Sequence, residues 1–314
     1  MTTLTPRSTK GASTRMPTGA FTALVTPFHN DAPRSIDWDA FDALVDAQIG
    51  AGISALVPCG TTGESPTLTS EERVAVIART VERARGRVPV FAGTGSNSTR
   101  ASIDASMRAL DVGASGVMLV VPYYNKPTQA GLEAHFIECA RAVRVPVIIY
   151  NIPSRCMVDM LPDAVARVCD AAENVVAMKE ATGNVLRAQE LVRRFGARLA
   201  VFSGDDTLTL PMMSVGGVGV ISVTSNAYPA EIVALTKHAL AGDFASARAM
   251  HLSLLPVHDA MFVESNPVPV KVALAEKGRM AATVRLPLVQ ASDESQKRIR
   301  ATMAQFSAAT AGFR

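Results

Sequence analysis

The chain has 314 residues, of which 48% are hydrophobic and 19% charged, and this composition excludes disorder for most of its length. The formal charge is 31 − 28 = +3, and the excess lies in Arg7, Lys10 and Arg15, all before the first acidic residue, Asp31. Because the remaining chain is neutral and has no basic stripe, we expect no nucleic-acid partner. The length fits either about two ordinary domains or one α/β barrel of about 250 residues with an appendage.

Four widely spaced cysteines form no C-x-x-C pair, which argues against a disulfide scaffold and a zinc ribbon and indicates the reducing cytoplasm. No apolar run approaches the roughly 20 residues that a membrane span needs, so we expect no membrane association. Residues 1–16 are polar and lack the apolar core of a secretory signal. We interpret them as a disordered N-terminal tail. A short transit-like segment, or an upstream start before a true start at Met16, remains an alternative.

From residue 20 onward, short apolar runs alternate with longer amphipathic segments. The runs are rich in Val and Ile and do not alternate with polar residues, as is typical of parallel strands covered on both faces. They cover residues 20–25, 55–57, 90–92, 116–121, 147–150, 175–178, 199–202 and 218–223.

Each run is followed by a segment whose apolar residues recur at helical spacing. Predicted helices cover 38–49, capped by Asp37, then a segment beginning at Ser70, then 98–112, 128–143, 161–169, 185–195, 207–215 and 229–240. Eight strand–helix units predict a (β/α)₈ TIM barrel over residues 17–240, with a doubly wound sheet as the alternative. Helical segments at 244–263, 267–277 and 292–306 predict a C-terminal helical domain over residues 241–314.

Barrel active sites gather at the carboxyl ends of the strands, and Lys179 directly follows one of the apolar runs. Burial would lower the pKa of its amine, and a neutral amine attacks carbonyl carbon to form a Schiff base. A lysine paired with Glu180 or Glu64 at a strand end is the alternative.

Tyr150 ends the preceding strand, about 4.8 Å away if the two strands are neighbours, so its phenol could transfer protons at the amine. Thr61 and Thr62 lie in a glycine-flanked turn where hydroxyl and main-chain N–H groups could bind a carboxylate or pass on a proton. Arg155 could bind a carboxylate with two parallel hydrogen bonds. A rim tyrosine, simple turn chemistry and a solvated surface arginine are the alternatives.

Asp205 and Asp206 could suggest a metal, but the five histidines lie on predicted helices or away from strand ends. We therefore expect no metal site. The glycine-rich segment at 93–98 lacks the spacing of a nucleotide-binding motif and is interpreted as a turn.

Taken together, these motifs resemble the dihydrodipicolinate synthase family of class I pyruvate aldolases, over about residues 19–290. The motifs that carry the resemblance are GTTGES at 60–65, PYYN at 122–125, YNIPSR at 150–155, KEATG at 179–183, SGDD at 203–206, GVGVIS at 217–222 and NP at 266–267. The resemblance implies a TIM barrel that condenses pyruvate with aspartate-4-semialdehyde, toward diaminopimelate and lysine, without metal or organic cofactor.

The resemblance also assigns catalytic roles by position. It implies that Lys179 forms an imine with pyruvate and that Tyr150 is the central acid and base. It further implies that Thr61 connects Tyr150 to Tyr124, which in the family enters from the neighbouring subunit. The family is typically a homotetramer built from tight dimers, and this chain is expected to be one.

For substrate binding, the resemblance assigns the pyruvate carboxylate to Thr62 and the aldehyde's carboxylate to Arg155, with the backbone of Gly204 and Ile221 lining the pocket. The chain departs from the family at Cys156-Met157, where Thr-Gly is usual, in the region beside the arginine that the resemblance assigns to the aldehyde. A sister lyase acting on N-acetylneuraminate or a 2-keto-3-deoxy sugar acid is the nearest alternative, and a barrel that has lost catalysis and senses a small molecule is another.

In lysine-inhibited members of the family the effector site resembles Ser65, Asn97 and Tyr123 of this chain, but two histidines and a glutamate are replaced here by Ser70, Arg73 and Ala101. Loss of the carboxylate leaves the effector's α-ammonium unpaired, and Arg73 would repel its side-chain ammonium. We therefore expect weak or no inhibition by lysine.

Overall fold

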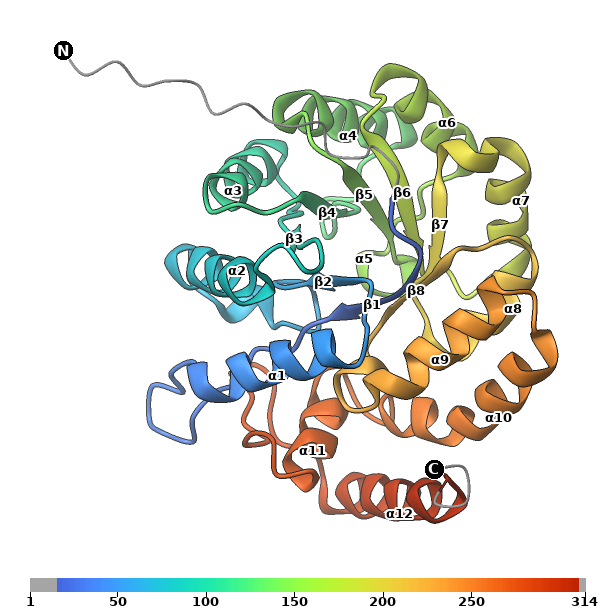
Figure 1. The fold of residues 1–314 in the computed structure, drawn as a ribbon. Coiled ribbons are helices and arrows are strands. Elements are labelled where there is room, and N and C mark those ends of the chain that lie inside the picture. The colour runs from blue at the N-terminus through green and yellow to red at the C-terminus, as the bar shows by residue number, and fades with distance from the viewer. Residues whose placement is uncertain (1–15, 311–314) are drawn as a thin grey trace.

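The computed structural model describes residues 16–310, which fold into eight parallel strands surrounded by helices (Figure 1). The strands are β1 (Gly19–Ala23), β2 (Ala55–Val57), β3 (Phe91–Gly93), β4 (Gly116–Val120), β5 (Val147–Asn151), β6 (Val175–Glu180), β7 (Ala200–Ser203) and β8 (Gly219–Ser222). Each predicted apolar run overlaps one of these strands, with ends that differ by at most two residues.

The sheet runs in the order β2-β1-β8-β7-β6-β5-β4-β3, so the first strand pairs with the last. A parallel bridge between Leu56 and Val90 joins the two ends of this order. The predicted TIM barrel is confirmed. A doubly wound sheet is excluded because such a sheet would leave β1 and β8 unpaired with each other.

The helices are α1 (Trp38–Gly50), α2 (Ser70–Ala84), α3 (Thr99–Asp111), α4 (Gln129–Val143), α5 (Pro153–Cys156), α6 (Pro162–Ala171), α7 (Val185–Phe195), α8 (Thr209–Ser214), α9 (Pro229–Leu240), α10 (Phe244–Ala260), α11 (Val268–Glu276) and α12 (Asp293–Thr310). Asp37 caps α1 as predicted, by accepting a hydrogen bond from the Ala40 main-chain N–H. Helix α2 begins at Ser70 as predicted and is capped by Thr69, which forms a reciprocal capping box with Glu72.

Two local features differ from the prediction, and both lie at the carboxyl ends of strands. Strand β6 continues through Lys179 and Glu180, because these residues pair with Phe202 and Ser203 of β7. The short helix α5, which carries Arg155, was not predicted. One turn of helix is too short to produce a hydrophobic period in the sequence.

Aromatic side chains fill the centre of the barrel. The Phe21 ring lies 4.6 Å from that of Phe202 and 5.8 Å from that of Phe91, measured between ring centroids. These rings come from β1, β7 and β3, which are not adjacent in the sheet, so the contacts cross the barrel interior. The barrel is therefore a packed core, and a site can form only at its mouth.

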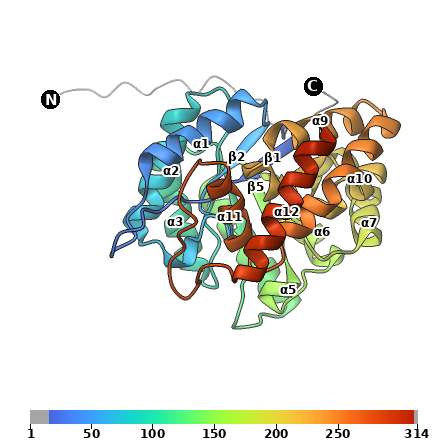
Figure 2. The same cartoon turned by 90° about the horizontal axis from the view of Figure 1, so that it is seen from below.

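The C-terminal helices pack on one side of the barrel, where α12 lies against both α10 and α11 (Figures 1 and 2). Buried Leu254 of α10 and Ile299 of α12 share a hydrophobic cluster with Ile232 and Leu235 of α9. The predicted division at residues 240 and 241 thus falls between α9 and α10, within one continuous core. No described helix combines the length and apolar character of a membrane span.

The predicted tail lies outside the described residues except for its last member, Met16. That side chain is buried and belongs to a core cluster that also contains Phe21 and Phe91. Met16 is therefore part of the packed body, whereas the interpretation of residues 1–15 as a tail stays a prediction.

Candidate active site at the carboxyl end of the barrel

Lys179 and Tyr150 lie side by side at the ends of neighbouring strands. They are register partners on β6 and β5, and the Lys179 Nζ lies 4.3 Å from the centroid of the Tyr150 ring. Only 4% of Lys179 and 5% of Tyr150 is exposed. The predicted proximity of amine and phenol is therefore observed, in surroundings that exclude most water.

Burial changes the acidity of both groups. It lowers the pKa of Lys179 to about 8; the charge of Asp206 opposes this shift and that of Arg155 adds to it. Burial also raises the pKa of the Tyr150 phenol, against the opposing influence of Arg155 and of a hydrogen bond with Thr61. At neutral pH the site thus combines a partly neutral amine with a protonated phenol, the states that nucleophilic attack and proton donation require.

Thr61 and Thr62 lie in a tight turn after β2. The Glu64 main-chain N–H donates to the Thr61 carbonyl at 3.1 Å, and the Thr26 hydroxyl donates to the Gly63 carbonyl at 2.8 Å. The Thr62 hydroxyl is buried and accepts a hydrogen bond of 3.0 Å from the Asn266 side-chain amide. The turn is therefore fixed by contacts on both of its sides.

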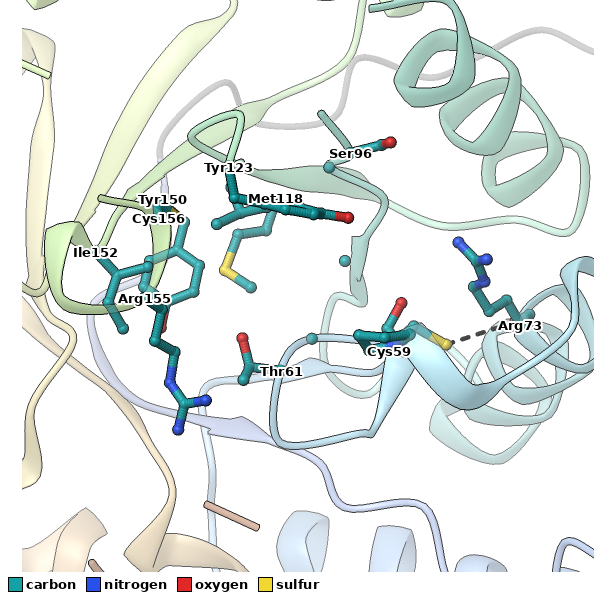
Figure 3. A pocket seen from close by; sticks show the side chains of 16 residues that line it. Cys59, Thr61, Arg73, Ser96, Met118, Tyr123, Tyr150, Ile152, Arg155 and Cys156 are labelled. Atoms are coloured by element: carbon teal, nitrogen blue, oxygen red, sulfur yellow. Dashed lines mark hydrogen bonds between the residues drawn. The ribbon is translucent and has the colours of Figure 1, made fainter. Parts of the chain in front are cut away.

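Arg155 approaches the same region from α5. Its guanidinium donates to the Asn266 main-chain carbonyl at 3.5 Å and lines a cavity of about 400 Å³. Thr61, Tyr150 and Arg155 lie together at one end of this cavity, and Arg73 lies at the opposite end (Figure 3). The cavity is large enough for a small organic acid, and an arginine in its wall can bind a carboxylate.

Gly204 and Ile221, the two predicted backbone contacts, occupy crowded positions near the strand ends. A Cβ atom at Gly204 would lie 2.6 Å from the Cβ of Ala181, so the close approach of these two segments requires glycine. Ile221 is fully buried in β8 and pairs with Phe21 of β1.

Tyr124 is the most exposed of the predicted catalytic residues in the single chain. It is 89% exposed and adopts a left-handed backbone conformation with φ of 72°. Its neighbour Tyr123 lines the cavity instead. The role of Tyr124 thus stays a prediction that depends on a second copy of the chain.

Asp206 and Asn266 were not predicted as site residues. The buried carboxylate of Asp206 accepts main-chain hydrogen bonds from Val223 at 2.9 Å and Thr224 at 3.0 Å, and a short one from the Ser222 hydroxyl. The sequence analysis considered Asp205 and Asp206 as possible metal ligands and as part of the SGDD motif, but gave Asp206 no role in the site. No group of three potential ligands among His, Cys, Asp and Glu occurs within residues 16–310. Asp206 instead supplies the negative charge that most strongly raises the pKa of the reactive amine, against the effect of burial.

The comparisons with known proteins all match one family. A sequence model of the dihydrodipicolinate synthetase family matches residues 16–306. A 4-hydroxy-tetrahydrodipicolinate synthase from Sorangium cellulosum is 59% identical over 290 residues, which cover 92% of this chain and 96% of that protein. The synthase of the same name from Nitratidesulfovibrio vulgaris strain DP4 is 48% identical over 287 residues, covering 91% of this chain and 97% of that protein.

Among solved structures, dihydrodipicolinate synthase from Aquifex aeolicus superposes with a TM-score of 0.90 at 44% identity, covering 92% of this chain and 98% of that one. The resemblance predicted from the motifs is confirmed by these matches, which extend over nearly the whole folded chain. The chain belongs to the dihydrodipicolinate synthetase family.

Proposed function

We propose that this protein condenses pyruvate with aspartate-4-semialdehyde to give 4-hydroxy-tetrahydrodipicolinate, in the cytoplasmic route to diaminopimelate and lysine. The observation that supports this most directly is the buried Lys179 amine, 4.3 Å from the Tyr150 ring at the carboxyl end of the barrel. Family membership and the name shared by its relatives support the same reaction.

The reaction begins when the neutral Lys179 amine attacks the keto carbon of pyruvate. Tyr150 donates the proton that lets the former carbonyl oxygen leave as water, and an imine results. The protonated imine withdraws electrons, so the adjacent methyl group loses a proton to form an enamine. The enamine carbon attacks the aldehyde carbon of the second substrate, and that substrate's own amine then attacks the imine carbon, closes the ring and releases Lys179.

Two residues provide the binding contacts. Thr62, together with main-chain N–H groups of its turn, binds the pyruvate carboxylate. Arg155 reaches into the cavity from α5 and binds the carboxylate of the aldehyde with two parallel hydrogen bonds. The covalent lysine imine supplies the electron sink, so this scheme requires neither a metal nor an organic cofactor.

Proton transfer between Tyr150 and solvent passes through Thr61 in this scheme. In this scheme the second tyrosine, Tyr124, is contributed by a neighbouring subunit, as the family resemblance implies, and its exposed side chain is compatible with that role. The dimer is then the catalytic unit, within a homotetramer. Sedimentation of the purified protein, with activity measured at each concentration, tests this: a fully active monomer would contradict it.

Reduction of the imine tests the function itself. The protein is incubated with pyruvate, treated with borohydride, digested and examined by mass spectrometry. We expect one modified residue, Lys179, and no adduct in Lys179→Ala. Turnover with pyruvate and aspartate-4-semialdehyde, compared with N-acetylmannosamine and sugar-derived aldehydes, separates the proposed activity from that of a sister aldolase. An adduct at another lysine, or turnover no better than that of Lys179→Ala, would refute the proposal.

A further inference from the structure

A buried ion pair lies behind the turn that carries Thr61 and Thr62. The Lys271 Nζ is 2.5 Å from the Glu64 Oε1, and the two side chains are 0% and 1% exposed. Glu64 belongs to the turn after β2, whereas Lys271 belongs to α11 in the C-terminal segment. The pair thus connects the candidate active site to a helix outside the barrel.

Both charged groups make additional contacts. The second carboxylate oxygen of Glu64 accepts the Arg285 main-chain N–H at 3.0 Å. The Lys271 ammonium donates to the Thr283 carbonyl at 2.9 Å and lies 4.2 Å from the centroid of the Phe28 ring. Burial lowers the pKa of Lys271 to about 8, against the pull of Glu64, so the ammonium form still predominates at neutral pH.

Glu64 is itself part of the turn, so the contacts that hold its side chain also restrict the turn backbone. Its main-chain N–H closes the turn on the Thr61 carbonyl, and its backbone adopts a left-handed conformation with φ of 53°. A non-glycine residue holds that conformation only where its surroundings determine it. Asn266, near the start of α11, donates to the Thr62 hydroxyl. The C-terminal segment therefore holds the turn at two points.

We propose that Glu64 and Lys271 are positioning residues for the proposed reaction: their ion pair fixes the turn so that Thr61 meets Tyr150 and Thr62 meets the keto acid. Stability alone is a weak reason for this pair, because a well-packed apolar pair of similar volume is often at least as stable as a buried ion pair. An ion pair also fixes the orientation of its two side chains, and catalytic groups are sensitive to displacements of about 1 Å. The inference rests on the function proposed above.

The main test is Lys271→Met, which removes the charge while keeping much of the side-chain length. Below the melting temperature of the variant, we expect kcat to fall about 10- to 100-fold and KM for pyruvate to rise, because the two hydroxyl groups are displaced. The Lys179 adduct should still form, since Lys179 and Tyr150 lie on β6 and β5. The pH dependence of kcat should also change, which a purely structural role would not cause.

Ile299→Ala is the matched control, because Ile299 is fully buried in α12 and removing its side chain weakens the C-terminal segment without breaking an ion pair. If Lys271→Met reduces kcat no more than this control does at equal distance from its melting temperature, the inference is overturned.

Glu64→Gln serves as the second variant. It preserves the shape of the side chain and an acceptor for the Arg285 N–H. If Lys271→Met fails to fold, Glu64→Gln tests the inference by the same measurements. Unchanged kcat, KM and pH profile in a folded Glu64→Gln, with no loss in Lys271→Met, would also overturn the inference. Failure of the proposed function is recognised separately, by the absence of a pyruvate adduct in the unmodified chain.

Discussion

The rate at which Lys179 captures pyruvate should follow the ionisation of its amine. With a pKa of about 8 in place of the ordinary 10.5, about a tenth of the amine is neutral at pH 7 and half at pH 8. An unperturbed lysine would be neutral in only about one molecule in 3,000 at pH 7, so burial increases the reactive form about 300-fold. The local environment therefore accounts for a large part of the nucleophilicity at neutral pH.

Rapid mixing with pyruvate, followed by borohydride quenching and quantification of the Lys179 adduct, measures this dependence. Between pH 6 and pH 7 the initial rate should rise about tenfold, and above pH 9 it should level off. A rate that continues to rise beyond pH 10 would show that the amine is not perturbed. A rate independent of pH over this range would show that amine ionisation does not limit capture.

Two variants are expected to shift the midpoint of this pH dependence in opposite directions, and they test its electrostatic cause. The Arg155 charge lowers the pKa of Lys179 and the Asp206 charge raises it. Arg155→Met should therefore move the midpoint to higher pH and Asp206→Asn to lower pH. An asparagine at 206 can keep both main-chain hydrogen bonds through its oxygen and direct its NH₂ group at the Ser222 hydroxyl. Shifts of both variants in the same direction would refute this electrostatic account.

Three further outcomes are expected. Arg155→Ala should mainly raise KM for the aldehyde in steady-state kinetics, because it removes a contact made in both ground and transition states, and an unchanged KM would disprove the assignment. Lysine should inhibit weakly or not at all, because Arg73 lines the cavity together with Ser65 and Tyr123; an inhibition constant below a millimolar would contradict this. Gly204→Ala should lower the free energy of unfolding by about 1–3 kcal/mol, because the new Cβ would lie 2.6 Å from that of Ala181, and an unchanged melting temperature would show that this approach relaxes freely.

The sequence was sufficient to predict the barrel because its strands and its longer helices each leave a local pattern. Apolar runs such as 116–121 are bounded by serine and proline, and capped amphipathic segments such as 185–195 keep one face apolar. The position of Lys179 next to such a run also predicted its burial, because a residue at the end of a covered strand enters the site with it. Elements too short to show a hydrophobic periodicity, such as the single turn of α5, left no comparable signal in the sequence.

Only the tertiary structure decided which distant residues support these predicted ones. Asn266 bonds to Thr62 across 204 residues of chain, and Lys271 pairs with Glu64 from a helix that the sequence could place only as part of an appendage. The role of Asp206 as the counter-charge to Lys179 likewise appears only when β7, which precedes Asp206, pairs with β6. Local patterns specify elements because their causes are local, whereas the partner of a buried polar group depends on how the closed barrel and its covering helices bring separate segments into contact.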